Sequence, residues 1–271
     1  MPSVMFPPAT VENYCYELRA KEAVPQCPVC GTANPSLRAT ARWNIFVGVS
    51  QCRCSLGYLN PRLTAAEYAD FYTSWYRPLV EAHRPPSRRA TPRLANVWCY
   101  GDAIGRLIRP YIMPGGALLD VGGSNGRVAA EVARHVQAET VMIIDPNPAE
   151  LADAATLGYQ TRLGTGEDPL PRGECYQGIL CARTIDHVRE PVPMLRSLRA
   201  ALAPGGWLWI DFVDAARLRA AWPLSAWRID HPLYWSVTSL KAALAQTGWV
   251  VVQHWRAHDI SHHVGFLCQG A

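Results

Sequence analysis

The second half of the chain alternates short apolar runs with stretches in which apolar residues recur at helical spacing. The apolar runs have the length of strands, and this alternation is typical of a parallel α/β sheet. The predicted strands are residues 117–121, 140–145, 159–163, 178–181 and 207–211. The predicted helices are residues 127–136, 151–157, 191–202 and 236–247, and residues 249–254 and 264–269 form a closing apolar pair of strands.

The first half follows a different pattern. Thr64 with Glu67 three residues later forms a capping-box sequence, which predicts the start of a helix. Aromatic residues then recur at helical spacing, which favours packing against a neighbouring domain: Tyr68, Phe71, Tyr72, Trp75 and Tyr76. The basic, proline-rich stretch 83–93 indicates a linker, and Thr91 caps a helix that ends near Ile108. We therefore predict three parts, residues 1–82, 83–112 and 113–271.

Four of the nine cysteines occur as two close pairs, Cys27-Pro-Val-Cys30 and Cys52-Arg-Cys54, with 21 residues between the pairs. A Cys-x-x-Cys turn points both sulfurs into one small loop, and four thiolates complete a closed, tetrahedral site. The residues between the pairs, 37–49, suit a short hairpin. The sequence thus predicts a zinc ribbon with structural Zn²⁺. The alternative is four buried or idle cysteines, with Cys15 as a possible substitute ligand.

Charge is unevenly distributed along the 271 residues. Residues 1–112 contain 13 Arg and Lys against 7 Asp and Glu, whereas the remainder contains 13 against 15. A basic first part could attract an anionic partner, such as a nucleotide-linked substrate or RNA, although a solvated face is the simpler interpretation. No apolar run approaches the length that spans a bilayer, and the first residues lack a signal-peptide pattern. We therefore expect no membrane association and a cytoplasmic location.

A glycine-rich loop follows the first predicted strand of the α/β region. Gly122, Gly123 and Gly126 stand between that strand and its helix. Such a loop presents backbone N–H groups and the positive end of a helix to a ligand, and glycines let the backbone come close to it. Many nucleotide-binding folds carry a loop of this kind, so the loop alone does not name the ligand.

From residue 117 onward the chain resembles the class I S-adenosylmethionine-dependent methyltransferases. Five stretches in order carry the resemblance: Leu118-Leu-Asp-Val-Gly-Gly-Ser-Asn-Gly126, Ile143-Ile-Asp145, Gly164-Thr-Gly-Glu-Asp168, Ile179-Leu-Cys-Ala-Arg-Thr-Ile-Asp-His187 and Leu202-Ala-Pro-Gly-Gly206. The front half resembles a subset of these enzymes with an N-terminal zinc ribbon, followed by an Asn-Pro turn (Asn60-Pro61) and a Tyr–Arg segment (Tyr72 to Arg77). That subset often modifies sugars or other small biosynthetic intermediates. The resemblance implies a Rossmann-like, mostly parallel sheet with an antiparallel C-terminal strand, plus the small zinc-ribbon domain.

The resemblance also implies roles for residues at the strand ends. The cofactor-binding set is Asp120, Gly122, Gly123, Ser124, Gly126, Asp145, Pro146, Glu167, Asp168 and Ala182. Asp120 is expected to orient the loop or accept from the methionine ammonium, and Asp145 to accept from the ribose hydroxyls. Glu167 or Asp168 is expected at the adenine, with Thr165 as a weaker alternative. Ser124 departs from the family pattern, which has glycine at this position.

The acceptor side is less defined. Transfer to a hydroxyl or an acidic carbon needs a base, and histidine has a suitable pKa. His187 follows the fourth strand, where open α/β sheets bind ligands, and a structural histidine is the competing interpretation. His231 and Tyr234 belong to a His-x-x-Tyr segment that in related enzymes roofs the acceptor pocket. Arg77, Arg183 and Arg228 could hold an anionic acceptor group.

These observations together predict a methyltransferase that acts on oxygen or carbon of a small molecule, such as a sugar nucleotide or a secondary-metabolite intermediate. Two alternatives stay open. An RNA methyltransferase would use the basic ribbon to hold RNA, and a non-catalytic protein would keep the fold and bind a partner only. The C-terminal His254, His258, His262 and His263 are expected on and between two strands rather than at a metal. The sequence does not indicate the oligomeric state.

Overall fold

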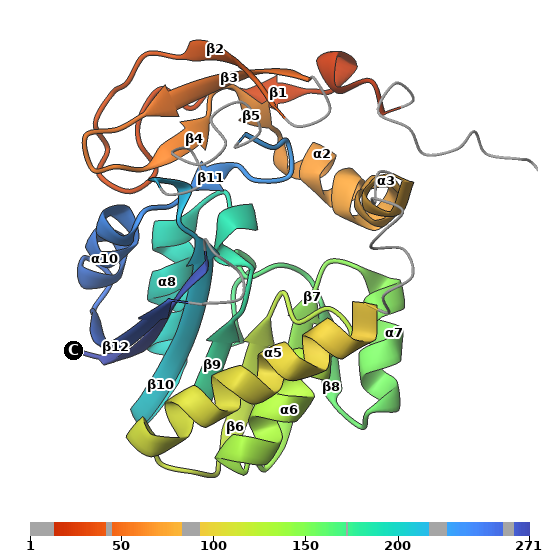
Figure 1. Cartoon of the computed structure of the whole chain (residues 1–271), viewed down its shortest axis with the longest axis vertical. Coiled ribbons are helices and arrows are strands. Elements are labelled where there is room, and N and C mark those ends of the chain that lie inside the picture. The colour runs from red at the N-terminus through yellow and green to blue at the C-terminus, as the bar shows by residue number, and fades with distance from the viewer. Residues whose placement is uncertain (1–13, 42–44, 83–92, 172, 217–226, 257–262) are drawn as a thin grey trace, which may run out of the picture.

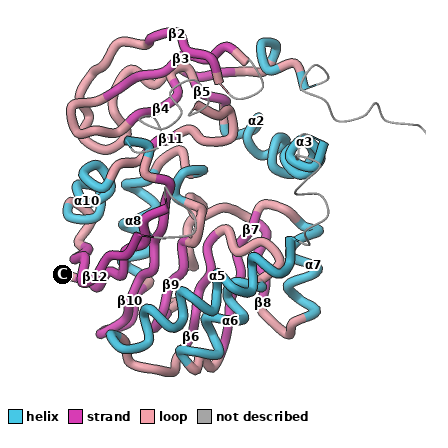
Figure 2. Tube along the Cα trace, viewed as in Figure 1, coloured by secondary structure: helices cyan, strands magenta, loops and turns pink. Residues whose placement is uncertain are grey.

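The computed structural model describes residues 14–41, 45–82, 93–171, 173–216, 227–256 and 263–271 (Figure 1). Most of the predicted linker, the Thr91 cap, His258 and His262 lie outside these ranges. In the described part, two sheets stand one above the other, with a helical segment beside the upper one (Figures 1 and 2). No helix among the described residues is long and apolar enough to cross a membrane.

The larger sheet has seven strands in the order β12-β13-β10-β9-β6-β7-β8. Its strands are β6 (Ala117–Val121), β7 (Thr140–Asp145), β8 (Gln160–Leu163), β9 (Tyr176–Cys181), β10 (Leu202–Val213), β12 (Trp249–Arg256) and β13 (His263–Gly270). Strands β6 to β10 pair in parallel, and β13 pairs antiparallel with both β10 and β12. The predicted fold class, a Rossmann-like sheet with an antiparallel C-terminal strand, is confirmed.

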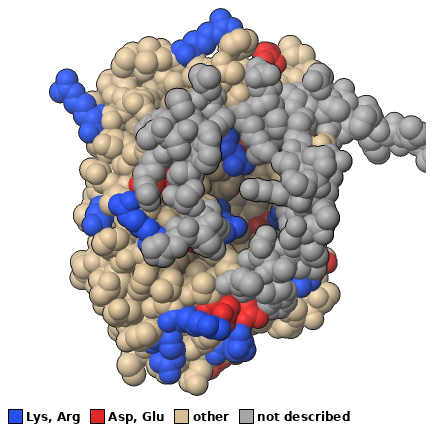
Figure 3. Space-filling view, viewed as in Figure 1, with Lys and Arg blue, Asp and Glu red and all other residues tan. Residues whose placement is uncertain are grey.

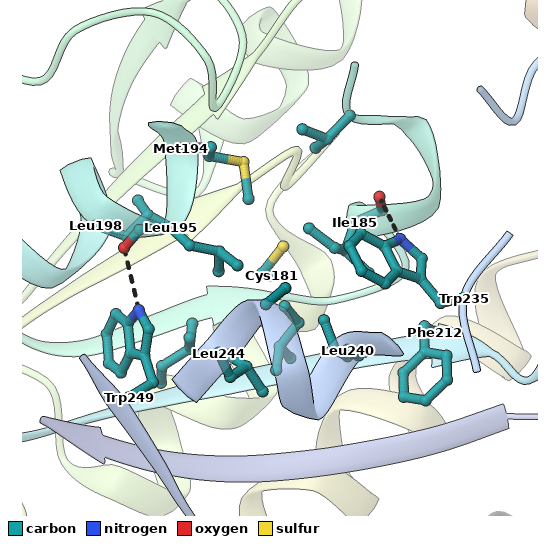
Figure 4. Packing of buried hydrophobic residues seen from close by; sticks show 14 of the residues in the cluster. Cys181, Ile185, Met194, Leu195, Leu198, Phe212, Trp235, Leu240, Leu244 and Trp249 are labelled. Atoms are coloured by element: carbon teal, nitrogen blue, oxygen red, sulfur yellow. Dashed lines mark hydrogen bonds between the residues drawn. The ribbon is translucent and has the colours of Figure 1, made fainter. Parts of the chain in front are cut away.

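Helices cover both faces of this sheet. One face carries α5 (Arg93–Ile108), η4 (Arg109–Tyr111), α6 (Arg127–Val136) and α7 (Pro148–Thr156), and the other carries α8 (Pro191–Ala200) and α10 (Val237–Ala245). Two buried indoles tie the second face together, because Trp249 donates to the Leu195 carbonyl and Trp235 to the Ile185 carbonyl (Figure 4). Each indole thus buries a large apolar area while its N–H group keeps a partner.

Two local sequence signals explain where α7, which packs on this sheet, begins. Asn147 caps α7, since its side chain accepts from the N–H groups of Ala149 and Glu150, and Pro148 occupies the first helical position. Strand β10 is longer than predicted. The predicted strand covers residues 207–211, but the chain already pairs with β9 at Leu202, and a shift of register lies between Leu202 and Trp207.

The smaller sheet has four strands in the order β11-β4-β3-β2. They are β2 (Leu37–Thr40), β3 (Phe46–Gln51), β4 (Gly57–Leu59) and β11 (Leu233–Tyr234), and β1 (Lys21–Glu22) pairs separately with β5 (Arg62–Leu63) near the short η1 (Tyr16–Leu18). The β2–β3 pair is the predicted hairpin. Strand β11 comes from the predicted methyltransferase part, so the smaller sheet is built from both parts of the chain.

A helical segment, residues 65–82, follows the smaller sheet. It consists of α2 (Ala65–Asp70), the π-helical turn η3 (Phe71–Trp75) and α3 (Tyr76–Ala82). Thr64 caps it by accepting from the Glu67 N–H group, as predicted. The Glu67 side chain does not complete the capping box, because it accepts from the Ala20 N–H group and pairs with Arg19 instead.

Candidate cofactor and acceptor site

The glycine loop leaves the sheet at the carboxyl end of β6, between β9 and β7. Gly122 has φ of +70°, and a Cβ there would lie 2.5 Å from the Thr184 hydroxyl oxygen. A Cβ at Gly123 would lie 2.7 Å from the Asp120 carboxylate. Both positions therefore require glycine, the first for its backbone conformation and both for space. The loop residues 122–125 are half-buried, and the N–H groups of Gly122 and Gly123 donate to the Ile144 carbonyl, which holds the loop against β7.

Asp120 places an unpartnered carboxyl oxygen beneath the loop. The residue is 1% exposed, and its Oδ2 atom has no hydrogen-bond partner among the residues that the structure describes. Burial, and then the nearby Asp145 and Asp211 carboxylates, raise the pKa of Asp120 well above its usual value. A ligand ammonium group at this point would supply the missing partner. The methionine end of S-adenosylmethionine carries such a group, so Asp120 fits the predicted role.

Asp145 ends β7 and organises the loop beside it. Its Oδ2 accepts from the Ser124 N–H group (2.9 Å), and its Oδ1 accepts from the Asn147 N–H group (2.9 Å). Burial raises the pKa of Asp145, and these two backbone bonds partly offset that effect. Each carboxylate oxygen can accept more than one hydrogen bond, so capacity for two ribose hydroxyls remains. Pro146, which follows, is half-buried at the same edge.

The predicted adenine residues are already engaged within the protein. Asp168 accepts from the backbone N–H (2.6 Å) and the hydroxyl (3.2 Å) of Thr165, which closes the turn after β8. Glu167 accepts from the backbone N–H groups of Arg189 (3.1 Å) and Glu190 (2.6 Å) at the start of α8. Both side chains shape this turn, and their contact with an adenine stays a prediction.

Ala182 and Arg183 follow β9 directly. Arg183 has φ of +54°, its N–H group donates to Asp211 Oδ1 (3.0 Å), and its guanidinium lies 4.0 Å from the Tyr100 ring centre. Asp211 also accepts from the Tyr100 hydroxyl, so α5 is tied to this strand end. The half-buried Ala182 therefore sits at a fixed backbone position beside the glycine loop.

The predicted acceptor side includes His187, at the end of the short helix η5 (Ile185–His187). His187 Nδ1 lies 2.7 Å from the Tyr72 hydroxyl and 2.8 Å from the Asp230 carbonyl oxygen. The Tyr72 hydroxyl also donates to that carbonyl (2.7 Å). A carbonyl oxygen only accepts, so an unprotonated Nδ1 would set two lone pairs against each other. The hydrogen-bond network thus assigns the proton to Nδ1 and leaves the lone pair on Nε2.

Burial governs the charge of both histidines. Burial, assisted by the Arg228 and Arg77 charges, lowers the pKa of His187 despite its contact with Asp230. The pKa of His231 is lowered well below its usual value, by burial and then by Arg228. The two rings meet edge to face, with centres 4.5 Å apart. Both imidazoles are therefore neutral near pH 7, the form that can accept a proton.

Asp230 holds this cluster together. It is 1% exposed, and Arg228 grips it with Nε to Oδ1 (3.1 Å) and Nη2 to Oδ2 (2.8 Å). Burial alone would raise the pKa of Asp230, but the guanidinium outweighs it and holds the pKa below its usual range. His187, Asp230 and His231 could offer ligand atoms within 4.8 Å of one another, yet a cation would have to displace Arg228. The arrangement suits proton transfer better than metal binding.

Tyr234 has a supporting position. Its hydroxyl donates to the Arg228 carbonyl (2.7 Å) and accepts from the Arg228 N–H group. Tyr234 thereby fixes the backbone that presents Asp230 and His231. His187, His231 and Tyr234 are all predicted from the sequence, and the structure brings the three together. Tyr72 and Asp230 are not predicted for the site. Tyr72 belongs to an aromatic stripe that is typical of packing.

The four predicted zinc ligands also converge. Cys27 Sγ lies 3.6 Å from Cys54 Sγ, and Cys30 Sγ lies 3.3 Å from Cys52 Sγ. All four sulfurs lie within 4.8 Å of one another. Sulfurs on a tetrahedral Zn²⁺ at its usual bond length would be about 3.8 Å apart. The donor set and its spacing thus fit a closed zinc site. His254 and His263 lie on β12 and β13, away from it.

Comparison with known proteins agrees with this geometry. The fold and the glycine-loop edge define a class I S-adenosylmethionine-dependent methyltransferase. A family model described as "Methyltransferase domain" matches residues 93–254, and the chain belongs to that family. A ubiquinone biosynthesis O-methyltransferase of Vibrio vulnificus is 30% identical over 105 residues. That match covers 37% of this chain and 45% of the relative, so the chain spans less than half of the relative's length.

Solved structures of methyltransferases share the fold. An S-adenosylmethionine-dependent methyltransferase of Leishmania major superposes with a TM-score of 0.55 at 16% identity, covering 74% of this chain and 86% of that one. The DhpI–SAH complex superposes with a TM-score of 0.52 at 19% identity, covering 76% and 94%. At these identities the likeness concerns the fold alone.

Proposed function

We propose that this protein transfers a methyl group from S-adenosylmethionine to oxygen or carbon of a small molecule, with His187 as the general base. The cofactor supplies an electrophilic methyl group when bound. Asp120 would hold its ammonium, Asp145 its ribose, and the glycine loop its methionine backbone. The distant ubiquinone O-methyltransferase relative favours a small-molecule acceptor, and oxygen as the methylated atom.

The observation that carries the proposal is the position of His187. Tyr72 and the Asp230 carbonyl hold its Nδ1 side, which leaves the Nε2 lone pair available for a proton. His231 is a weaker base candidate, because its Nε2 lies 3.7 Å from Asp230 Oδ2, beyond hydrogen-bond distance, and Arg228 disfavours its protonation. A base that removes the acceptor proton as the bond forms can raise the rate by about 10²- to 10⁴-fold.

We also propose that Cys27, Cys30, Cys52 and Cys54 bind one structural Zn²⁺. All four positions are thiolates, so no position remains open for a substrate, and the role of the metal would be to fix the smaller sheet. Arg228 is paired with Asp230 and Arg77 with Glu150, so Arg183 is the cation of the three predicted ones that favours an acceptor with an anionic group. Figure 3 shows basic and acidic atoms in a hollow in the middle of one face.

The test is methyl transfer from isotopically labelled S-adenosylmethionine to a panel of acceptors. Sugar nucleotides and phenolic acids represent small molecules, and a structured RNA represents the alternative partner. We expect label in one of the small-molecule groups and a large loss with His187→Gln. Label in RNA only would overturn the small-molecule proposal. Cofactor binding without transfer to any class would favour a non-catalytic role.

A further inference from the structure

Arg77 connects the helical segment 65–82 to the glycine loop. Its Nη2 donates to the Ser124 hydroxyl oxygen (3.0 Å), and its Nε lies 3.0 Å from Glu150 Oε1 on α7. The Ser124 hydroxyl in turn donates to Glu150 Oε2 (2.5 Å). The three side chains thus form a closed ring of hydrogen bonds, half-buried at the join between the two parts of the chain. Charged partners make such bonds stronger than neutral ones.

Ser124 is the residue that departs from the family's glycine pattern, and this ring gives the departure a physical reason. Ser124 has φ of +51°, a conformation that costs a non-glycine residue energy. Glycine at this position would avoid that cost but could not bond to Arg77. On its backbone side, Ser124 donates to Asp145, the predicted ribose carboxylate. Arg77 and the ribose site are therefore joined through one residue.

The same helical segment reaches the acceptor side through Tyr72. Tyr72 and Arg77 are five residues apart, which in an α-helix would place them about 140° apart around the axis. The π-helical turn between them changes this, since the Tyr76 N–H group bonds to the Phe71 carbonyl, five residues back. A π-turn brings residues i and i+5 towards the same side. Tyr72 can then face His187 while Arg77 faces the glycine loop.

The Arg77 charge acts on both sites. It helps to offset the burial that raises the pKa of Asp145, and it adds to the burial that lowers the pKa of His187. An ion pair between partly exposed groups would by itself contribute little stability. Arg77 lies between the predicted ribose carboxylate, Asp145, and the proposed base, His187. This position suggests a role in holding the two sites together rather than in stability.

We propose that Arg77 is a positioning residue, which couples occupancy of the cofactor loop to the helical segment that carries Tyr72 to the acceptor side. This inference rests on the proposed function, because it takes the glycine loop as the cofactor site. Cofactor held by the loop and Asp145 would fix Ser124, and Ser124 would fix Arg77 and the segment. Bound cofactor would thereby strengthen the contact that the helical segment already makes with His187.

Hydrogen–deuterium exchange with S-adenosylhomocysteine as the probe tests this without needing the acceptor. In the wild-type protein we expect the ligand to slow exchange at least threefold in peptides covering residues 117–126 and in those covering 65–82. In Arg77→Gln, residues 117–126 should still respond while 65–82 should not. Arg106→Gln is the matched control, since Arg106 is a mostly exposed cation paired with Asp102 on α5, and it should behave as wild type.

Ser124→Gly is the second variant, in case Arg77→Gln folds poorly. Glycine tolerates this backbone conformation, and the Arg77–Glu150 pair is retained, so only the link to the loop is lost. Its backbone N–H group can still donate to Asp145, so at a saturating concentration of the probe we expect residues 117–126 to respond while residues 65–82 do not. No protection of either region in the wild type would overturn the proposed function. Protection of 117–126 alone in the wild type, or an unchanged response of 65–82 in both variants, would overturn the coupling.

Discussion

The Tyr72 hydroxyl lies 2.7 Å from Nδ1 of His187, although 115 residues separate the two in sequence. Tyr72 comes from the helical segment before the α/β sheet, and His187 follows strand β9 within it. The contact means that the acceptor side is assembled from both parts of the chain. Under the proposed function, the first part of the protein would therefore position the base that lies in the second part.

His187→Gln should lower methyl transfer by about 10²- to 10⁴-fold with little change in cofactor affinity. Glutamine keeps a donor for the Asp230 carbonyl but cannot accept a proton. Tyr72→Phe removes one hydrogen bond to the base and should cost up to about tenfold. Steady-state kinetics on the acceptor found in the labelling screen provide the measurement. Equal losses in the two variants would argue against His187 as the base.

The rate should fall in acid and stay flat around neutrality. Burial lowers the pKa of His187, so the neutral base is present at pH 7 and is protonated only as the pH falls below the usual histidine value. The predicted profile of kcat against pH therefore has its acidic limb below about pH 6.5. A limb centred above pH 7 would point to a different base.

Asp145→Ala should abolish cofactor binding. The carboxylate is expected to accept from the ribose, and it also holds the N–H groups of Ser124 and Asn147, so the variant loses both the contact and the loop shape. Asp145→Asn keeps one acceptor oxygen and should bind with intermediate affinity. Titration calorimetry with S-adenosylmethionine measures both. Undiminished affinity in the alanine variant would remove Asp145 from the site.

One zinc ion per chain is expected by elemental analysis. Cys27→Ser removes a buried ligand, and loss of a structural metal is among the few changes that cost on the order of 4 kcal/mol or more. In a chain of this size the thermal midpoint should fall by roughly 10 °C. Cys175→Ser, which changes an exposed cysteine away from the cluster, is the control. Metal-free protein with an unchanged midpoint would contradict a structural zinc.

Asp186→Asn should stabilise the protein more as the pH rises. Burial raises the pKa of Asp186 to about 8, whereas the unfolded chain ionises near 3.8. Between these values the unfolded state releases a proton that the folded state keeps, so wild-type stability falls from about pH 4 to pH 8 relative to a variant that cannot titrate. Asparagine can still accept from the Val213 N–H group. Urea midpoints at pH 5 and pH 8 give the comparison, and a gap that shrinks with pH would contradict it.

The sequence predicts the elements of the larger sheet well because their signals are local. The predicted strands 117–121 and 140–145 coincide with β6 and β7, and the predicted helix 127–136 coincides with α6. The glycine loop and Asp145 are adjacent to these elements, so their places follow from the strand order. The spacing of the cysteines within each pair predicts by itself that the four thiols converge.

The acceptor side could not be predicted to the same depth. The helical segment that brings Tyr72 to His187 contains a π-turn, and no sequence pattern in residues 71–75 predicts one. Asp230 matters through its backbone carbonyl and its buried carboxylate, and neither property leaves a pattern in sequence. The sequence shows only that Ser124 departs from the family pattern, and the hydrogen bonds of its hydroxyl group with Arg77 and Glu150 are seen only in the structure.

Strand β11 has a consequence for how such proteins can be recombined. Leu233 and Tyr234 pair with Tyr58 and Gly57, so the last strand of the smaller sheet is encoded more than 170 residues after its neighbour. A front half exchanged between homologues at residue 82 or 112 would arrive without its own edge strand. Chimeras should therefore remain folded only when residues 57–59 and 233–234 are taken from the same parent. The two parts of the chain then have to be exchanged together.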